Sequence, residues 1–295
     1  MLLSEVYRSG NCSIVRDARV ESVGFLSDPQ PSMLVFLESR RFLSTLRRTK
    51  EATCVITYRE YAGEVDFIEG LAISDEPRLT FHQIHEYLAL QTSFYWADFY
   101  TEIDPTASVH PTACVAARNV RIGPRTRVEA NATILERCTV GADAVIHSGV
   151  VLGSVGFQTT RCNSGMKEMT HAGSVEIRDG AQILANAVVA RGVFLQSTVI
   201  GCDARIGACA FVSHNVQIGA RTFVGHGAVV NGNVKIGEDV WIGPSSSVAN
   251  GVSIGDRAEV TLGSVVIGNI EPGTRVAGNF AIEHRLLLKH VARIR

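Results

Sequence analysis

Aliphatic side chains recur at every sixth position between Thr198 and Ile267. Twelve consecutive positions at this spacing are Ile or Val. They are Ile200, Ile206, Val212, Ile218, Val224, Val230, Ile236, Ile242, Val248, Ile254, Val260 and Val266. A short fixed period is typical of a solenoid in which each repeat stacks on the one before it, and a hexapeptide period predicts a parallel β-helix.

The same repeat extends toward the N-terminus with two interruptions. It opens at Ile103, slips by one residue before Ile122 and continues to Leu152. It then returns at Ile177, Ile183, Val189 and Leu195. Three hexapeptides would form one triangular coil of a left-handed β-helix, with the aliphatic residue inside and Gly, Asn or Asp at the corners, where left-handed backbone angles are needed. The aperiodic loop 153–176 is too long for a simple turn, and we expect it to be functional.

The chain divides into three predicted parts. Residues 1–100 lack the repeat and predict a small α/β domain with strands at 33–37, 52–57 and 70–73 and helices at 39–48 and 77–90. Residues 101–272 form the left-handed β-helix with the inserted loop 153–176. Residues 273–295 contain a predicted basic helix, 281–294, which would cap the open end of the solenoid.

Composition and charge argue against several classes of protein. The net charge is −1 with both signs mixed, so the sequence lacks the basic stripe of a nucleic-acid-binding protein. It shows no secretory signal and no run of about 18 apolar residues that would predict a transmembrane helix. The seven cysteines include no CxxC pair, which favours reduced thiols and a cytoplasmic location.

Two pairs of side chains in the first domain suggest binding sites. Phe36 ends a strand and Phe42 follows six residues later, so the two rings could clamp a flat ligand, although the spacing alone favours ordinary core packing. His82 and His85 lie three residues apart on a predicted helix. Because no third ligand is evident, we interpret them as solvated or rim histidines and predict no metal site.

Candidate catalytic residues lie within the repeat. His214 follows the inward-facing Val212 by two residues and should point outward, where a neutral imidazole could act as a general base. Gly232 lies 18 residues later, one coil above, so its backbone N–H could stabilise an oxyanion beside His214. His226 is a second candidate for the base and His147 a third. A surface histidine without a catalytic role is the alternative for His214.

Three stretches in the correct order resemble the UDP-3-O-acylglucosamine N-acyltransferase family of lipid A synthesis, from the N-terminus to about Glu271. They are residues 35–42 followed by 52–56, residues 153–157, and residues 213–219. The resemblance implies that Phe36, Ser39 and Phe42 bind the nucleotide base, making residues 1–100 a nucleotide-binding domain. It further implies that Gly156, Phe157 and Gln158 belong to a substrate loop, and that His214 and Gly232 form the catalytic pair in a homotrimer. Candidate donor-binding residues are Asn215, Asn250, Arg275 and Arg285.

The sequence also departs from that family. Phe42 and Ser39 replace a Tyr and an Asn, and Gly207 stands where the family has an acidic residue seven positions before its His. Residues 276–281 resemble the ending of acetyl-CoA-dependent sugar acetyltransferases. We therefore predict an N-acyltransferase that acts on a UDP- or dTDP-linked amino sugar. Its donor would be acyl-CoA or acyl carrier protein, with no tightly bound cofactor. The alternatives are the lipid A enzyme itself, which uses acyl carrier protein, and a non-catalytic β-helix that binds nucleotide sugars.

Overall fold

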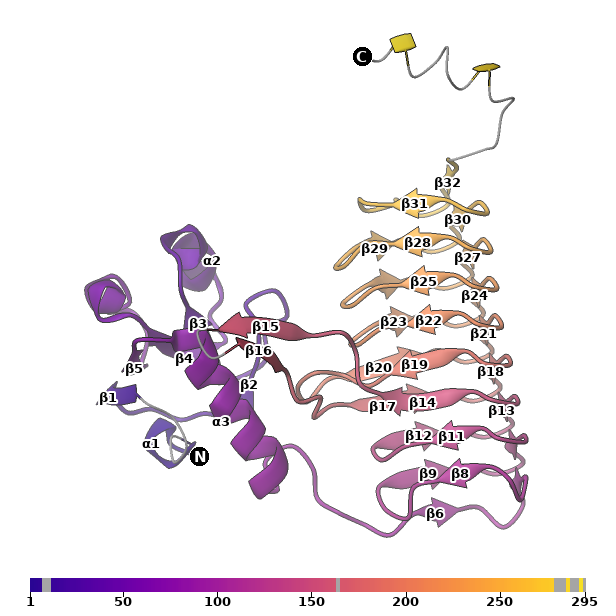
Figure 1. Cartoon of the computed structure of the whole chain (residues 1–295), viewed down its shortest axis with the longest axis horizontal. Coiled ribbons are helices and arrows are strands. Elements are labelled where there is room, and N and C mark those ends of the chain that lie inside the picture. The colour runs from indigo at the N-terminus through magenta and orange to yellow at the C-terminus, as the bar shows by residue number, and fades with distance from the viewer. Residues whose placement is uncertain (7–11, 163–164, 279–284, 287–291, 294–295) are drawn as a thin grey trace. The chain divides into compact units, whose positions relative to one another are not determined.

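The computed structural model describes residues 1–6, 12–162, 165–278, 285–286 and 292–293. By its internal contacts the chain separates into two compact units (Figure 1). Unit 1 comprises residues 1–99 together with residues 155–174 and 192–196. Unit 2 comprises residues 100–154, 175–191 and 197–295. Two segments that interrupt the hexapeptide repeat therefore belong to unit 1.

Unit 1 is built on a five-stranded sheet with the order β1-β5-β4-β3-β2. The strands are β1 (Cys12–Arg16), β2 (Ser22–Val23), β3 (Met33–Leu37), β4 (Ala52–Thr57) and β5 (Gly70–Ser74), with β1 antiparallel to β5 and the others parallel. The helices are α1 (Leu3–Val6), α2 (Leu43–Arg48) and α3 (Pro77–Gln91), and the 3₁₀ turns are η1 (Arg40–Phe42) and η2 (Arg59–Glu64). The three predicted strands are confirmed, and the helix predicted at 39–48 begins as the 3₁₀ turn η1.

Both faces of this sheet are buried, which explains why its central strands are almost wholly apolar. On one face, Phe81, Ile84 and Leu88 of α3 pack in the same core as Leu34 and Ile56. On the other face, Leu46 of α2 packs with a second set of strand residues: Met33, Val35, Leu37, Val55 and Leu71. The alternation of strand residues between the two cores follows from the two-residue period of a β-strand.

The insertions complete the core on the α3 side. Residues 155–174 contain the antiparallel hairpin of β15 (Thr159–Cys162) and β16 (Gly165–Glu168), and Phe194 of the second insertion is fully buried in the α3 core. His85 contacts the Tyr95 hydroxyl through Nδ1 and the Thr170 carbonyl through Nε2, both at 2.7 Å. The prediction that His82 and His85 are solvated or rim histidines is therefore wrong, since both are buried, at 7% and 0% exposed.

Unit 2 consists of stacked coils whose parallel strands form three sheets, one for each side of the prism, as the β-helix prediction requires (Figure 1). Sheet A contains β7 (Ser108–Val109), β10 (Arg127–Val128), β13 (Val145–Ile146), β18 (Gln182–Ile183), β21 (Arg205–Ile206), β24 (Phe223–Val224), β27 (Trp241–Ile242), β30 (Glu259–Val260) and β32 (Arg275–Val276). Sheet B contains β8 (Cys114–Val115), β11 (Thr133–Ile134), β14 (Val151–Ser154), β19 (Val188–Ala190), β22 (Phe211–Val212), β25 (Val229–Val230), β28 (Ser247–Val248) and β31 (Val265–Val266). Sheet C contains β6 (Glu102–Ile103), β9 (Val120–Ile122), β12 (Cys138–Val140), β17 (Ser174–Ile177), β20 (Ser197–Ile200), β23 (Gln217–Ile218), β26 (Lys235–Ile236) and β29 (Ser253–Ile254). The predicted fold class is confirmed for both units.

The hexapeptide aliphatics fill the interior of the β-helix, and a second inward position two residues earlier holds a small or β-branched residue. Where that residue is Thr222, its hydroxyl donates to the Gly237 carbonyl at 2.8 Å, so the buried polar group is satisfied. Corner residues have positive φ, as predicted for Gly, Asn and Asp. Arg125 and Arg221 also occupy such corners, and each binds the Asp one coil above. That charge-assisted contact offsets part of the cost of the left-handed backbone.

The six-residue spacing after Val189 predicts that Leu195 points into the β-helix, and the structure differs from this prediction. Leu195 is 49% exposed and lies in unit 1, because residues 192–196 interrupt the repeat and the inward position passes to Ile200. This insertion and the longer one at 155–174 both leave the β-helix at the corner between sheets B and C, in consecutive coils. The same corner carries the one-residue slip between Val115 and Ile122.

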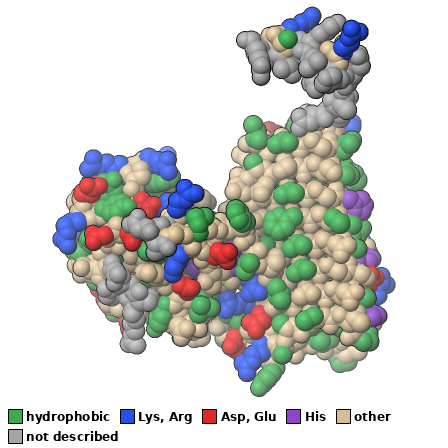
Figure 2. All heavy atoms as spheres, viewed as in Figure 1, with side chains coloured by type: hydrophobic (Ala, Val, Ile, Leu, Met, Phe, Trp, Pro, Cys, Tyr) green, Lys and Arg blue, Asp and Glu red, His purple; other side chains and the backbone are tan. Residues whose placement is uncertain are grey.

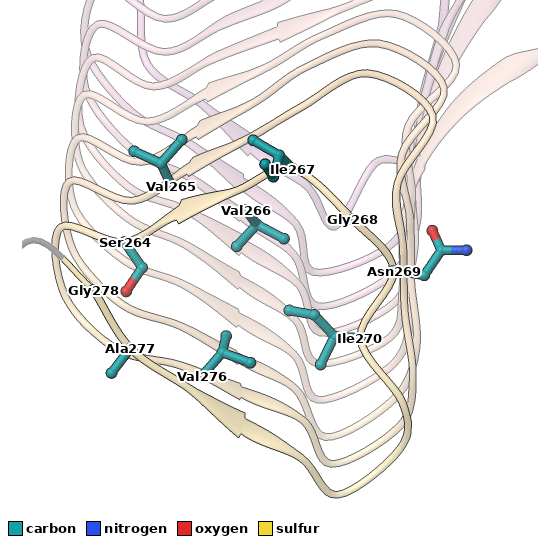
Figure 3. A pocket seen from close by; sticks show the side chains of 10 residues that line it. All are labelled: Ser264, Val265, Val266, Ile267, Gly268, Asn269, Ile270, Val276, Ala277 and Gly278. Atoms are coloured by element: carbon teal, nitrogen blue, oxygen red, sulfur yellow. The ribbon is translucent and has the colours of Figure 1, made fainter. Parts of the chain in front are cut away.

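The last coil of the β-helix ends in an open cavity of about 380 Å³ (Figure 3). Val266, Ile270 and Val276 point into the prism there, continuing the apolar interior to its end. The helix predicted at 281–294 as a cap falls mostly outside the described residues. Among the described helices, none is both long and apolar enough to cross a membrane.

Candidate functional site

His214 lies at the corner where β22 of sheet B turns toward β23 of sheet C. The parallel pairing of Val212 with Val230 places Gly232 at the same corner one coil above, so the structure brings the two predicted residues together. His214 is 7% exposed. The imidazole is therefore held against the surface of the β-helix rather than extended into solvent.

Gly232 leaves the space that the imidazole occupies. A Cβ atom at this position would lie 2.6 Å from Nε2 and 3.0 Å from Nδ1 of His214, and closer still to Cε1. Any side chain here would therefore displace the ring. Within the described part of the chain, the Gly232 N–H donates no hydrogen bond, while its carbonyl accepts one from the Gly251 N–H at 3.0 Å. The site thus places the Nε2 and Cε1 atoms of His214 beside Gly232, whose backbone N–H is available as a hydrogen-bond donor.

Arg191 occupies the same corner one coil below His214, through the pairing of Val189 with Val212. Its Nε donates to the Gly153 carbonyl at 2.7 Å. Burial, together with the nearby Arg137, lowers the pKa of Arg191. The six-residue spacing did not align this residue with His214, because the insertion 192–196 makes the spacing from Arg191 to His214 23 residues instead of 18. If the five residues of the insertion are subtracted from this spacing, the 18-residue period of one coil is recovered.

The other two histidine candidates lie at a different corner, between sheets A and B. His226 is exposed, and its Nδ1 accepts a hydrogen bond from the Ala208 N–H at 2.8 Å. The neutral ring must then carry its proton on Nε2, which leaves no lone pair for a general base. His147 contacts Glu129 through Nδ1 at 3.2 Å. Gly207 lies at this corner as well, against Gly225 and His226, so the position seven residues before His214 does not adjoin it within one chain.

The four candidate donor-binding residues are separated by the fold. Asn215 is a corner residue with a φ of 59°, and its side chain donates to the Asn233 amide oxygen at 3.0 Å, which indicates a structural role. Asn250 is exposed one coil above Gly232 at the same corner. Arg275 lies in sheet A and pairs with Glu259, away from that corner. Arg285 is exposed.

A cavity of about 330 Å³ in unit 1 contains the two predicted aromatic residues. Three rings line it, from Phe25, Phe36 and Phe42, together with the charged side chains of Glu38, Arg41 and Arg78. The Arg78 guanidinium lies 5.3 Å from the centre of the Phe36 ring and that of Arg41 lies 4.5 Å from the centre of the Phe42 ring. Ser39 is not among the lining residues. A volume of this size is within the range of small-molecule sites.

The predicted substrate loop begins next to a buried histidine of unit 1. The Gly156 N–H donates to Nε2 of His171 at 3.1 Å, and Nδ1 of His171 contacts the Met169 carbonyl at 3.0 Å. Phe157 is 94% exposed, and the Gln158 carbonyl accepts a hydrogen bond from the Met169 N–H at 2.9 Å. The base of the loop is therefore fixed while the Phe157 ring faces solvent.

Comparison with known proteins finds a family model that matches the hexapeptide repeat and named proteins that are similar to most of the chain. Residues 119–154, 197–232 and 233–268 match the family model described as bacterial transferase hexapeptide (six repeats). A protein of Coxiella burnetii named UDP-3-O-acylglucosamine N-acyltransferase is 28% identical over 253 residues, covering 74% of this chain and 70% of its own length. A protein of the same name from Herminiimonas arsenicoxydans is 27% identical, covering 71% of this chain and 68% of its own length.

Among solved structures, the UDP-N-acetylglucosamine acyltransferase from Campylobacter jejuni is 20% identical. It aligns with a TM-score of 0.49 over 65% of this chain and 81% of that chain. The resemblance stated from the sequence motifs is confirmed by the named relatives. The roles of the individual site residues remain predictions.

Proposed function

We propose that this hexapeptide-repeat acyltransferase transfers an acyl group from a thioester to the amine of a nucleotide-linked amino sugar. The named relatives, which match about three quarters of the chain, support N-acyl transfer. The observation that carries the proposal for this chain is the approach of Gly232 to the His214 imidazole at one corner of the β-helix. No tightly bound cofactor is needed for this reaction, since the activated acyl group arrives as a thioester.

The chemistry requires a base and an oxyanion donor. His214 would accept a proton as the sugar amine attacks the thioester carbonyl. The carbonyl oxygen would become negatively charged in the tetrahedral intermediate, and the Gly232 N–H would donate to it. When the intermediate collapses, the C–S bond breaks, the thiolate leaves, and the proton held by His214 can pass to it. Each group thus has one role, and neither requires a metal.

The acceptor would be presented by unit 1. Its aromatic cavity supports binding of a flat nucleobase, with UDP or dTDP as the carrier of the sugar. The relatives' name favours UDP-3-O-acylglucosamine as one specific acceptor, with acyl carrier protein as the donor that the lipid A enzyme would use. Acyl-CoA is the alternative donor, which the sequence ending at 276–281 favours.

A homotrimer would supply the groove for the pantetheine arm of the donor. Figure 2 shows apolar side chains gathered on the face of unit 2 where Figure 1 draws β19, β22, β25 and β31. Their outward residues are Val188, Phe211, Val229 and Val265, which are half-buried or exposed in one chain. Apolar surface of this kind favours association between copies.

Acyl-transfer assays would test the proposal. The purified chain would be offered acetyl-CoA, longer acyl-CoAs and acyl carrier protein thioesters, each with UDP- and dTDP-linked amino sugars, and free thiol release would be measured. Turnover should require an amino sugar and fall by about 100-fold or more in His214→Ala. Turnover confined to the carrier-protein donor would exclude acyl-CoA as the donor, and an inactive wild-type protein would favour the non-catalytic alternative.

A further inference from the structure

The aromatic cavity of unit 1 contains an ion pair with unused hydrogen-bonding capacity. Two nitrogens of Arg78, Nε at 2.9 Å and an Nη at 2.7 Å, both contact the same carboxylate oxygen, Oε2 of Glu38. Within the described part of the chain, no hydrogen bond reaches Oε1 of Glu38. Both residues line the cavity. The ion pair therefore fixes one carboxylate oxygen and leaves the other available to a ligand.

The surroundings hold this pair in place. The Glu38 side chain is only 26% exposed, since it follows β3 directly at the edge of the buried sheet. Arg78 is stacked on Phe36, which itself contacts the buried Phe81 ring with centroids 5.0 Å apart. A guanidinium fixed by an aromatic face and a carboxylate retains little freedom. The acceptor oxygen is therefore preorganised, which lowers the entropic cost of binding a ligand there.

An aromatic cavity with one fixed carboxylate suits a flat ring that bears an N–H. A carboxylate only accepts hydrogen bonds, so its partner must be a donor. Uracil and thymine carry one ring N–H, N3–H, flanked by two carbonyl oxygens. The Arg78 guanidinium next to Glu38 offers donors for one of those oxygens. Ser39, the residue for which the family resemblance implied base recognition, does not line the cavity.

We propose that Glu38, held by Arg78, is the specificity-determining residue of the nucleotide site and accepts the ring N3–H of a uracil or thymine base. This proposal rests on the proposed function, because it presumes that unit 1 binds the nucleotide of the acceptor. It moves base recognition from Ser39 to the neighbouring residue. The rings of Phe36 and Phe42 supply contact area, while Glu38 supplies the hydrogen bond that distinguishes one base from another.

Calorimetric binding to the full chain tests this assignment without using acyl transfer. The ligands compared are UDP and its N3-methyl analogue, which keeps the ring but lacks the N3–H, and binding of dTDP to the wild type is measured as well. Wild-type protein should bind UDP about 10- to 100-fold more tightly than the analogue, as expected for loss of a hydrogen bond to a charged acceptor. Glu38→Ala should bind UDP weakly and lose this discrimination. Glu38→Gln keeps an acceptor oxygen and should retain part of it.

The exposed Glu51 provides the matched control, since it belongs to unit 1 but does not line the cavity. Glu51→Ala should bind both ligands as the wild type does. Thermal melts would establish that each variant is folded. If folded Glu38→Ala discriminates between the two ligands as well as the wild type, the assignment of Glu38 is overturned and nucleotide binding still stands. If the wild type binds neither UDP nor dTDP, both this inference and the nucleotide-linked acceptor are overturned, whatever the acyl-transfer assay shows.

Discussion

Gly232→Ala is the sharpest perturbation of the candidate active site, because it adds one methyl group directly against the His214 ring. The new Cβ would lie 2.6 Å from Nε2, whereas a comfortable contact between such atoms is about 3.5 Å, so the ring must move by roughly 1 Å. The φ angle of Gly232 is not in the left-handed region, so the backbone tolerates Ala without strain. The whole effect should therefore come from the steric conflict.

Two consequences follow from that displacement. Overpacking against a ring that is 7% exposed should lower the free energy of unfolding by about 1–3 kcal/mol. A misplacement of about 1 Å of a catalytic base should reduce turnover by about 100-fold. Turnover would be measured as thiol release at saturating donor and acceptor, and stability by urea unfolding.

Gly268→Ala is the matched control. Gly268 occupies the same corner two coils above Gly232, also lacks a positive φ, and has open space around its Cβ position. It should retain wild-type turnover and stability. In a His214→Ala background, Gly232→Ala should cost little stability, because its steric partner is gone. Wild-type turnover in folded Gly232→Ala, or an equal loss in Gly268→Ala, would contradict the steric explanation.

Three further predictions test other features of the two units. His226→Ala should leave turnover unchanged, in contrast to His214→Ala, because Nδ1 of His226 is committed to the Ala208 N–H; a comparable loss in both variants would reinstate His226 as a candidate base. Asn215→Ala should destabilise the chain by about 1–2 kcal/mol in urea unfolding, and Asn215→Gly by less, since only the former keeps a Cβ at a left-handed corner. Burial lowers the pKa of His82 to about 4, so its neutral form stabilises the fold above the unfolded pKa of about 6.5, and that contribution is lost as the pH falls toward 4. His82→Leu should therefore flatten the dependence of the melting temperature on pH across this range, and an unchanged slope would contradict the assignment.

The proposed catalytic pair and the proposed nucleotide-binding pair belong to different units, so substitutions can test them separately. The candidate catalytic pair, His214 and Gly232, lies in unit 2, while the Glu38–Arg78 pair lies in unit 1. Nucleotide binding and acyl transfer can therefore be lost independently. Glu38→Ala should raise the acceptor concentration needed for half-maximal rate, whereas His214→Ala should lower the maximal rate with little effect on UDP binding.

The β-helix can be predicted from the amino-acid sequence, because its inward positions recur at a fixed spacing that depends on local backbone geometry. That spacing also predicts Gly232 one coil above His214. The buried strands at 33–37 and 52–57 could likewise be recognised, since a sheet covered on both faces requires continuous apolar runs.

Features that depend on contacts between distant segments could not be predicted in this way. The insertion 192–196 hid the alignment of Arg191 with His214 and left Leu195 exposed, because a break in the period cannot be measured until the next coil pairs. His82 and His85 proved buried, since residues 155–174 and 192–196 complete the core that covers α3. Glu38 rather than Ser39 lines the aromatic cavity, because the orientation of a side chain just after a strand depends on its partner, here Arg78, 40 residues away.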